Sequence, residues 1–215
     1  MSSPLPATAP PGPLLPAGNP RIVGIVNITA DSFSDGGRYL DPAAAVAHAR
    51  RLRAEGADII ELGPAASHPG SAPVTAAEER RRLAPVLEQL APDGIPVSVD
   101  SFRPETLRFA ISAGAACLND IHGFGDPGLY PLLAASQCRL VVMHAVQADG
   151  PATRVMTDPA AALAGIRDLK AAFGVPVLVS PSRKSFLRAL TGKDVTRSGP
   201  ATLAAEVFAA WVYGL

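Results

Sequence analysis

Six polar side chains stand where short apolar segments of the chain come to an end, and their types are those that bind ligands. They are Asn27, Glu61, Asp100, Asn119, His144 and Lys184. Taken singly, each has an ordinary explanation. An asparagine forms turns, an aspartate caps a helix, a lone histidine is more often a hydrogen-bonded core residue, and a lysine is solvated. Six such coincidences are much less probable together. Their amide and carboxylate oxygens suit a donor-rich ring, and their cations suit a leaving anion.

Residues 182–186, Ser-Arg-Lys-Ser-Phe, hold the densest group of such side chains. Two adjacent cations, Arg183 and Lys184, lie between two hydroxyls and follow the apolar run at residues 176–179. The pattern suits an anionic or heteroaromatic ligand. Read alone, the segment is explained equally well as a solvated basic turn.

Short apolar strands alternate with longer helical patterns after residue 20. Strands are expected at residues 22–28, 57–62, 96–99, 116–118, 139–143 and 176–179. Helices are expected at residues 41–56, 75–90, 104–113, from 126, at 158–174 and at 200–213. Several open with an Asp-Pro pair, and Thr75 with Glu78 forms a capping box. This alternation predicts an α/β fold with a buried parallel sheet.

Two parallel architectures fit this alternation, a (β/α) barrel and a doubly wound sheet. No glycine-rich turn follows the first strand, so a dinucleotide-binding sheet loses support. In a barrel the carboxyl ends of all strands meet on one face, where active sites are built. The polar strand ends therefore favour a TIM-type barrel.

Composition bears on the partners and the compartment of the protein. The 215 residues carry 19 basic and 19 acidic side chains, so nothing points to nucleic acid or an acidic membrane surface. No apolar run is long enough to span a membrane. Cys117 and Cys138 lack metal-ligand spacing, and we expect them to be reduced core residues of a cytoplasmic protein. Residues 1–20 are rich in proline and lack a secretory signal pattern, so we expect a disordered tail there and one domain over residues 21–215.

Three segments of the chain resemble the dihydropteroate synthase family. They are residues 27–37 (Asn-Ile-Thr-Ala-Asp-Ser-Phe-Ser-Asp-Gly-Gly), residues 119–121 (Asn-Asp-Ile) and residues 182–185 (Ser-Arg-Lys-Ser). The resemblance is nearly continuous from Val23 to His144 and resumes at Arg167. It implies a TIM barrel that joins 4-aminobenzoate to a dihydropterin methyl diphosphate in folate biosynthesis, releases pyrophosphate and uses Mg²⁺. A homodimer is compatible with it.

The same resemblance implies roles for individual residues. Asn27 would contact a Mg²⁺-diphosphate, while Asp100 and Lys184 would act at the pterin as catalytic residues. The implied substrate-binding residues are Asp31, Phe33, Glu61, Ser67, His68, Asn119, Arg183 and Ser185. Breaking the C–O bond develops positive charge on the pterin methylene and negative charge on pyrophosphate. A carboxylate, Mg²⁺ and cations therefore belong in this site.

The second loop departs from the family text. Residues 63–69 read Gly-Pro-Ala-Ala-Ser-His-Pro in place of Gly-Gly-Glu-Ser-Thr-Arg-Pro, so His68 replaces an arginine that would clamp phosphate. Glu61 stands where the family more often has aspartate. This loop, with Phe186 and residues 139–147, resembles the sulfonamide-insensitive branch of the family.

Two expected pieces of the family pattern are absent from the sequence. No Asp-Pro-Gly strand end lies between His144 and Pro176, and no Arg-x-His strand follows Leu215. We therefore expect a shortened barrel with six strands in place of eight. Three hypotheses stay open: an active or partly active synthase, an inactive pterin-binding relative, and another pterin-binding barrel such as a folate-dependent methyltransferase. Pyrophosphate release with and without aminobenzoate separates them.

Overall fold

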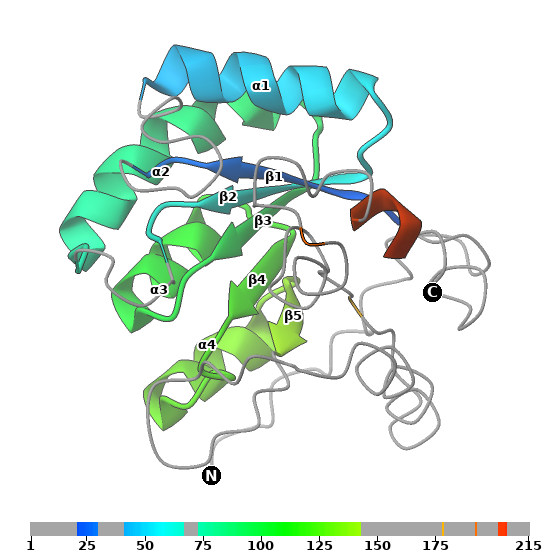
Figure 1. The fold of residues 1–215 in the computed structure, drawn as a ribbon. Helices are drawn as coiled ribbons and strands as arrows, with labels where there is room; N and C mark the ends of the chain where they lie inside the picture. Colours follow the sequence, from blue (N-terminus) through cyan, green and yellow to red (C-terminus); the bar gives the residue numbers. More distant parts are fainter. Residues whose placement is uncertain are drawn as a thin grey trace, which may run out of the picture.

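The described part of the chain is built around a parallel sheet of five strands (Figure 1). The computed structural model describes residues 21–29, 41–66, 73–142, 178, 192 and 202–205. The strands are β1 Val23–Asn27, β2 Ile59–Gly63, β3 Val97–Asp100, β4 Cys117–Asp120 and β5 Arg139–Val142. All four neighbouring pairs are parallel, in the order β1-β2-β3-β4-β5. The five strands expected between residues 22 and 143 are confirmed, with ends that differ by at most two residues.

Helical segments connect these strands. They are α1 Pro42–Ala54, α2 Ala76–Leu90, η1 Ala91–Asp93, α3 Pro104–Ser112, η2 Pro127–Leu129 and α4 Tyr130–Ala135. The Asp41 carboxylate accepts hydrogen bonds from the Ala43 and Ala44 amides, which satisfies donors that the first turn of α1 leaves free. In the same way, the Thr75 hydroxyl accepts from the Glu78 amide at 3.2 Å at the start of α2. The bond from the Glu78 amide to the Thr75 hydroxyl confirms the first bond of the capping box. The Glu78 carboxylate binds Arg81 and Arg82 instead of making the second bond.

The helix expected from Asp126 begins later than its sequence indicates. Asp126 caps a 3₁₀ turn, η2, and the α-helix starts only at Tyr130. Pro131 has no N–H to donate to the Pro127 carbonyl, and the Tyr130 N–H makes that bond instead, one residue earlier. The proline therefore tightens the first turn.

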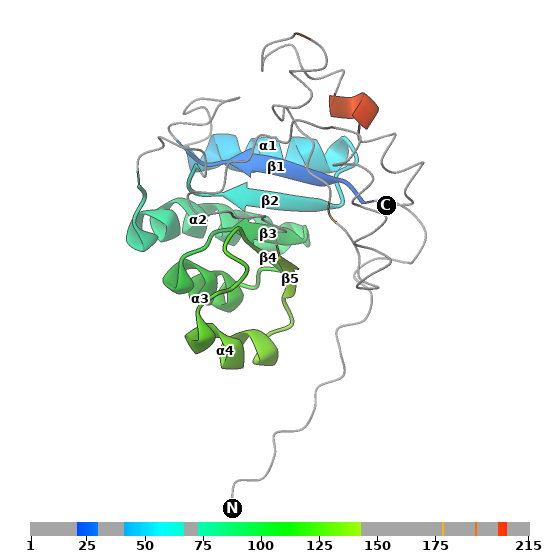
Figure 2. The same cartoon turned by 60° about the horizontal axis from the view of Figure 1, so that its bottom comes forward.

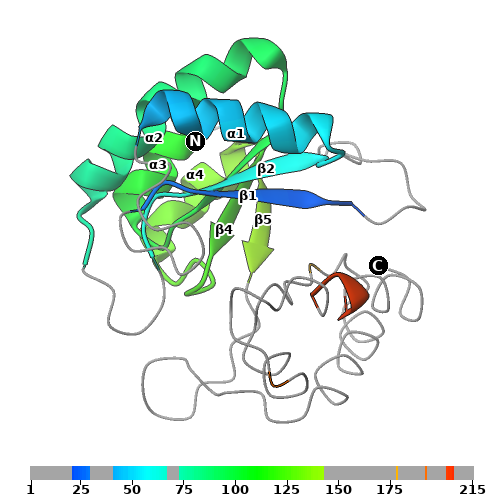
Figure 3. The same ribbon diagram turned by 45° about the horizontal axis from the view of Figure 1, so that its top comes forward.

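Strand order distinguishes between the two parallel architectures. A doubly wound sheet reverses its strand order at a switch point, whereas here each strand pairs with the next along the chain. Helices α1, α2 and α3 contact one another in sequence, and the four helices follow one side of the sheet (Figures 2 and 3). This is the arrangement of a TIM-type barrel. The other expected elements, the strand at 176–179 and the helices at 158–174 and 200–213, lie outside the described residues, except that 202–205 are helical.

The core lies between the sheet and the helices. Its strand side is formed by Val26, Ile60, Leu62, Val97, Val99 and Leu118, all no more than 6% exposed. Helical residues such as Leu83, Leu90 and Leu107 cover them. The opposite face carries a different row: Ile25, Glu61, Ser98, Cys117 and Arg139 are successive register partners. Alternate residues of a strand face opposite sides of the sheet, so this row, which includes Glu61, Ser98 and Arg139, lies on the side away from the core.

Candidate functional site

Three of the expected site residues lie in one register row at the carboxyl ends of the strands. Asn27 pairs with Gly63, and Asp100 pairs with Asn119. Leu62 pairs with Val99, so Gly63 and Asp100 are the next positions along those two strands. Asn27, Asp100 and Asn119 are all partly buried. The parallel sheet thus brings residues from β1, β3 and β4 to one edge, as their strand-end positions predict.

Glu61 lies two register positions before the row of Asn119, on the same face of the sheet, and orients the Asn119 amide. The Glu61 Oε2 atom accepts hydrogen bonds from Asn119 Nδ2 and from Ser98 Oγ, both at 3.2 Å. Because an ionised carboxylate only accepts, it takes the NH₂ group of Asn119 and leaves the amide oxygen for another partner. Burial raises the pKa of Glu61, and the bonds from Asn119 and Ser98 oppose that rise.

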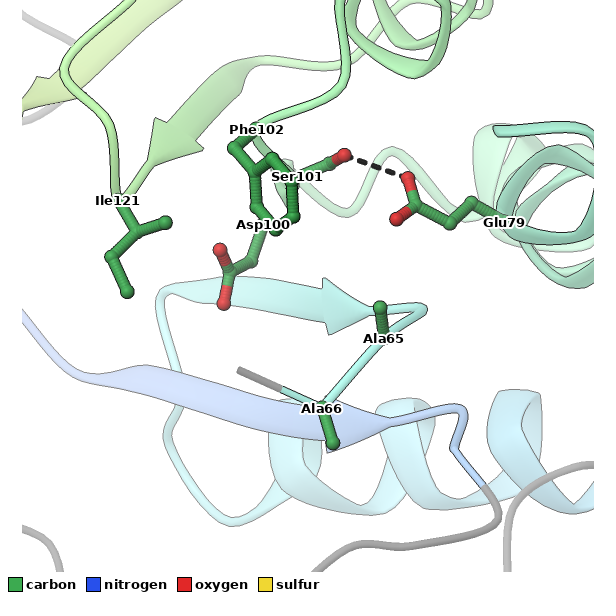
Figure 4. A pocket seen from close by; sticks show the side chains of 7 residues that line it. All are labelled: Ala65, Ala66, Glu79, Asp100, Ser101, Phe102 and Ile121. Atoms are coloured by element: carbon green, nitrogen blue, oxygen red, sulfur yellow. Dashed lines mark hydrogen bonds between the residues drawn. The ribbon is translucent and has the colours of Figure 1, made fainter. Parts of the chain in front are cut away.

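A small pocket opens beside this edge (Figure 4). It is lined by Ala65, Ala66, Glu79, Asp100, Ser101, Phe102 and Ile121. The Asp100 carboxylate points into the space between Ile121 and the two alanines, which follow β2. An acceptor in this position, beside the Asn119 amide oxygen that has no hydrogen-bond partner among the described residues, suits the N–H groups of a flat heterocycle.

A buried carboxylate of α2, that of Glu79, binds the segment that follows β3. Glu79 is 1% exposed, and its Oε2 atom accepts a hydrogen bond of 2.7 Å from Ser101 Oγ. Its other oxygen lies 3.4 Å from Arg103 Nε. The Ser101 hydroxyl also accepts from the Arg103 amide at 3.1 Å. These contacts fix the residues that directly follow Asp100.

Asp120 is buried and shapes the turn that follows β4. It is 2% exposed, and its two oxygens accept hydrogen bonds from the His122 and Phe124 amides at 2.7 and 2.9 Å. These bonds shape the turn after β4, in which Phe124 has a φ of 58°. Turn formation was one reading of the Asn119-Asp120 pair, and it is confirmed for Asp120.

Sequence reasoning missed two residues of α2, Glu79 and Arg82. The signal was available in the helical period of α2. Its buried residues are Glu79, Leu83, Val86, Leu87 and Leu90, so Glu79 lies on the apolar stripe itself. Arg82 directly precedes Leu83 in that stripe and has a side chain only 13% exposed. A charge on a buried stripe requires a partner, and such a residue is therefore a candidate for holding other segments.

The remaining expected site residues fall outside the part of the chain that the structure describes. These are Asp31, Phe33, Ser67, His68, Arg183, Lys184 and Ser185, together with His144. Their roles stay predictions. Among the described residues, no cluster of three His, Cys, Asp or Glu side chains forms a metal site. No helix there has the length and apolar character needed to cross a membrane.

Asn27 was expected to contact a Mg²⁺-diphosphate, and its amide oxygen is a hard oxygen ligand of the kind that Mg²⁺ takes. Its Oδ1 atom lies directly over Gly63, where an added Cβ would meet it at 3.1 Å. Mg²⁺ commonly takes only one or two protein oxygens, and substrate phosphates and water supply the others. A single amide oxygen at the strand end fits that pattern.

Comparisons with known proteins find relatives over most of this chain. A family model described as a pterin binding enzyme matches residues 23–160. The chain is 48% identical over 234 residues to a dihydropteroate synthase type-2 from Escherichia coli, with 88% of this chain and 86% of that protein covered. The alignment is longer than the 215 residues of this chain, so the relative has residues without a counterpart here. That is consistent with the missing Asp-Pro-Gly strand.

Two solved structures of the Xanthomonas albilineans dihydropteroate synthase have a similar fold. The complex with 4-aminobenzoic acid is 34% identical, with a TM-score of 0.76 over 90% of this chain and 84% of that chain. The complex with 7,8-dihydropteroate is 33% identical, with a TM-score of 0.76 over 92% of this chain and 86% of that chain.

Proposed function

Because this chain belongs to the dihydropteroate synthase family, whose members are transferases of folate biosynthesis, we propose that it joins 4-aminobenzoate to dihydropterin methyl diphosphate. The observation that carries the proposal is the row of Asn27, Asp100 and Asn119 at one edge of the sheet. Asp100 and the free oxygen of Asn119 would accept hydrogen bonds from the N–H groups of the pterin. Glu61 would support Asn119 from below.

The reaction breaks one bond and forms another at the same carbon. The C–O bond between the pterin methylene and the diphosphate breaks, and its electron pair leaves with pyrophosphate. The amine nitrogen of 4-aminobenzoate then forms a C–N bond and loses one proton to solvent water. Positive charge develops on the methylene, and Asp100 would stabilise it through the pterin ring. An aromatic amine is a sufficient nucleophile, so no activating base is needed.

The diphosphate would lie at the β1 end of the row. Asn27 would hold Mg²⁺ there, and the ion, when bound, supplies positive charge for the leaving pyrophosphate. His68, Arg183 and Lys184 would add to this charge or contact the pterin. Ser185 would help place the aminobenzoate, the loop with Asp31 and Phe33 would close over the site, and Ser67 would bind substrate. The ligands of the similar structures, 4-aminobenzoic acid and 7,8-dihydropteroate, support this assignment of substrate and product.

Drug response and compartment belong to the same proposal. The similarity to a type-2 enzyme and the altered loop at residues 63–69 support weak inhibition by sulfonamides. Cys117 and Cys138 are free thiols, as expected for a reducing cytoplasm. We propose the cytoplasm as its compartment.

A second candidate function is binding without efficient turnover. It is favoured by one observation, the stretch of the type-2 relative that has no counterpart in this chain. A protein of this kind would retain the pterin contacts of β3 and β4 and would release pyrophosphate slowly.

One assay on the purified chain separates these candidates. Pyrophosphate release is followed from the pterin diphosphate with Mg²⁺, with and without 4-aminobenzoate, beside calorimetric titration of the pterin. Release that depends on aminobenzoate supports the synthase. Pterin binding without such release identifies the inactive binder. A chain that neither binds the pterin nor releases pyrophosphate would overturn the proposal.

A further inference from the structure

Arg82 occupies the point at which the hydrogen-bond ladder between β1 and β2 ends. Among the described residues, the last backbone bond of this pair runs from the Ile28 amide to the Gly63 carbonyl at 2.8 Å. The next two carbonyls, those of Ile28 and Pro64, are bound by the guanidinium of Arg82. Its Nη1 atom donates to Ile28 at 3.3 Å and to Pro64 at 2.8 Å. The side chain thus extends the ladder by one bridge.

Arg82 is itself held firmly by α2. Its Nε atom donates to the Glu78 carboxylate at 2.7 Å, and its side chain is 13% exposed. The planar fork of an arginine allows one edge to bind a carboxylate while another nitrogen reaches two carbonyls. A lysine ammonium is a compact point charge and cannot span these three partners in the same way.

The position of this bridge connects it to the candidate site. Asn27 directly precedes Ile28, and Gly63 directly precedes Pro64. The Asn27 side-chain oxygen lies against Gly63, so the spacing of the two strand ends sets the place of that oxygen. Asp100 and Asn119 are on β3 and β4, where Arg82 makes none of its described hydrogen bonds.

We propose that Arg82 is a positioning residue that holds the ends of β1 and β2 together, and through them places the Asn27 amide for the Mg²⁺-diphosphate. The role in placing Asn27 for the diphosphate rests on the proposed function. The role in holding β1 and β2 together does not. Loss of Arg82 should therefore weaken diphosphate binding and spare the pterin contacts.

The chain offers a matched control in Arg81. Arg81 is the preceding residue of α2, donates to the same Glu78 carboxylate at 2.6 and 2.7 Å, and is 72% exposed. Arg81→Met and Arg82→Met each remove one positive charge and one ion pair of Glu78. Only Arg82→Met also removes the bonds to Ile28 and Pro64.

The first measurement is amide hydrogen exchange, which needs no ligand. We expect the Ile28 amide to exchange at least tenfold faster in Arg82→Met than in Arg81→Met. The Ser101 amide, which donates to the Asn119 carbonyl at 3.0 Å at the end of β3, serves as an internal reference and should not change. Equal Ile28 exchange in both variants would overturn the inference.

The second measurement is calorimetric titration with two probes. Pyrophosphate with Mg²⁺ should bind at least tenfold more weakly to Arg82→Met than to Arg81→Met. 6-Hydroxymethyl-7,8-dihydropterin, which has no diphosphate, should bind both variants within about threefold of the unsubstituted chain. Faster Ile28 exchange with unchanged pyrophosphate affinity would overturn the role in placing Asn27.

A third variant covers the case in which Arg82→Met does not fold. Arg82→Lys retains the charge and the ion pair, so it should fold, and it should still show faster Ile28 exchange than Arg81→Met. Exchange equal to that of the unsubstituted chain would show that charge alone suffices and would overturn the bridging role. If the unsubstituted chain does not bind Mg²⁺-pyrophosphate, the proposed diphosphate site fails, and the exchange measurement still decides whether Arg82 holds the strands.

Discussion

In the proposed site, Asp100 and Asn119 would offer acceptors of different strength to one edge of the pterin. Hydrogen bonds to a charged acceptor contribute about 1.5–3 kcal/mol, and those between neutral groups contribute about 0.5–1.5 kcal/mol. We therefore expect Asp100→Asn to lower kcat/KM about 10–100-fold and Asn119→Ala about 2–10-fold. Steady-state kinetics with the pterin diphosphate as the varied substrate tests this order. A larger loss for Asn119→Ala would contradict it, and circular dichroism on both variants controls for folding.

Glu61 gives a prediction about pH because burial raises its pKa above the ordinary value of 4.5. The folded chain then binds its proton more tightly than the unfolded chain. Folding stability contributed by the protonated form is present below pH 4.5 and is lost as the pH rises through the folded pKa. Glu61→Gln keeps an acceptor for Asn119 and Ser98 and does not titrate. Its stability relative to the unsubstituted chain should therefore increase as the pH rises above 4.5, as measured by urea unfolding from pH 4 to pH 8.

Glu78 supplies the control with the opposite sign. Bonds from Arg81 and then Arg82 lower its pKa from 4.5 to about 2. Its contribution to stability is present above pH 4.5 and is lost as the pH falls toward 2. Glu78→Gln should accordingly reduce the acid dependence of stability. If Glu61→Gln and Glu78→Gln both showed the same pH dependence of the free energy of unfolding as the unsubstituted chain, the pKa shifts assigned to Glu61 and Glu78 would be contradicted.

The residue scale also shows where sequence reasoning stops. The positions of Asn27, Asp100 and Asn119 followed from strand ends, because parallel strands place their carboxyl ends at one edge. The bond between Glu61 and Asn119 joins residues 58 apart and depends on the register of three strands. Spacing along the chain carries no information on that register. Arg82 was missed for the same reason, since its partners Ile28 and Pro64 lie in other segments.

At the scale of elements, the contact between β1, α1 and β2 depends on the absence of one side chain. A Cβ at Gly24 would lie 3.0 Å from Ala57 Cβ, 3.1 Å from Leu52 Cβ and 3.2 Å from Ile60 Cδ1. Overpacking of a filled core costs about 1–3 kcal/mol. We expect Gly24→Ala to lower the free energy of unfolding by about that amount, measured by urea unfolding.

Gly125→Ala is the matched control for this change. The nearest atom to a Cβ at Gly125 lies at 3.7 Å, an ordinary contact, and its φ is not in the left-handed region. Both substitutions therefore add one methyl group, and only Gly24→Ala adds it to a closed space. Equal stability of the two variants would show that α1 can move away from β1 at little cost.

The elements themselves were predictable because local signals marked both of their ends. Asp41 and Thr75 cap α1 and α2 as expected, and Pro104 opens α3. The one clear error, the start of α4, arose because Pro131 withdraws a donor that the capping pattern at Asp126 does not reveal. Such an effect depends on a residue one turn later.

At the scale of the whole molecule, the last described strand is covered less than its neighbour. Leu118 and Leu140 are register partners on the helix side of β4 and β5, yet Leu118 is fully buried and Leu140 is 42% exposed. Val142, two positions further along β5, is 62% exposed. In a TIM barrel this face is covered by the helix that follows the strand, and β5 would also pair with a sixth strand. The sequence lacks an Asp-Pro-Gly strand between His144 and Pro176, in the region that would supply both.

An exposed apolar strand face favours association between chains, and so does a strand edge such as that of β5, which has no partner strand among the described residues. We therefore expect the chain to associate at micromolar concentration, to unfold at a lower temperature than the type-2 relative and to release pyrophosphate more slowly. Insertion of the relative's Asp-Pro-Gly segment between His144 and Pro176 should reduce association and raise turnover, whereas a glycine–serine insert of equal length should do neither. Light scattering and pyrophosphate release on the three proteins measure these effects. A monomeric unmodified chain with turnover equal to that of the relative would contradict the prediction, because it would mean that the existing residues cover β5 and complete the site without the missing segment.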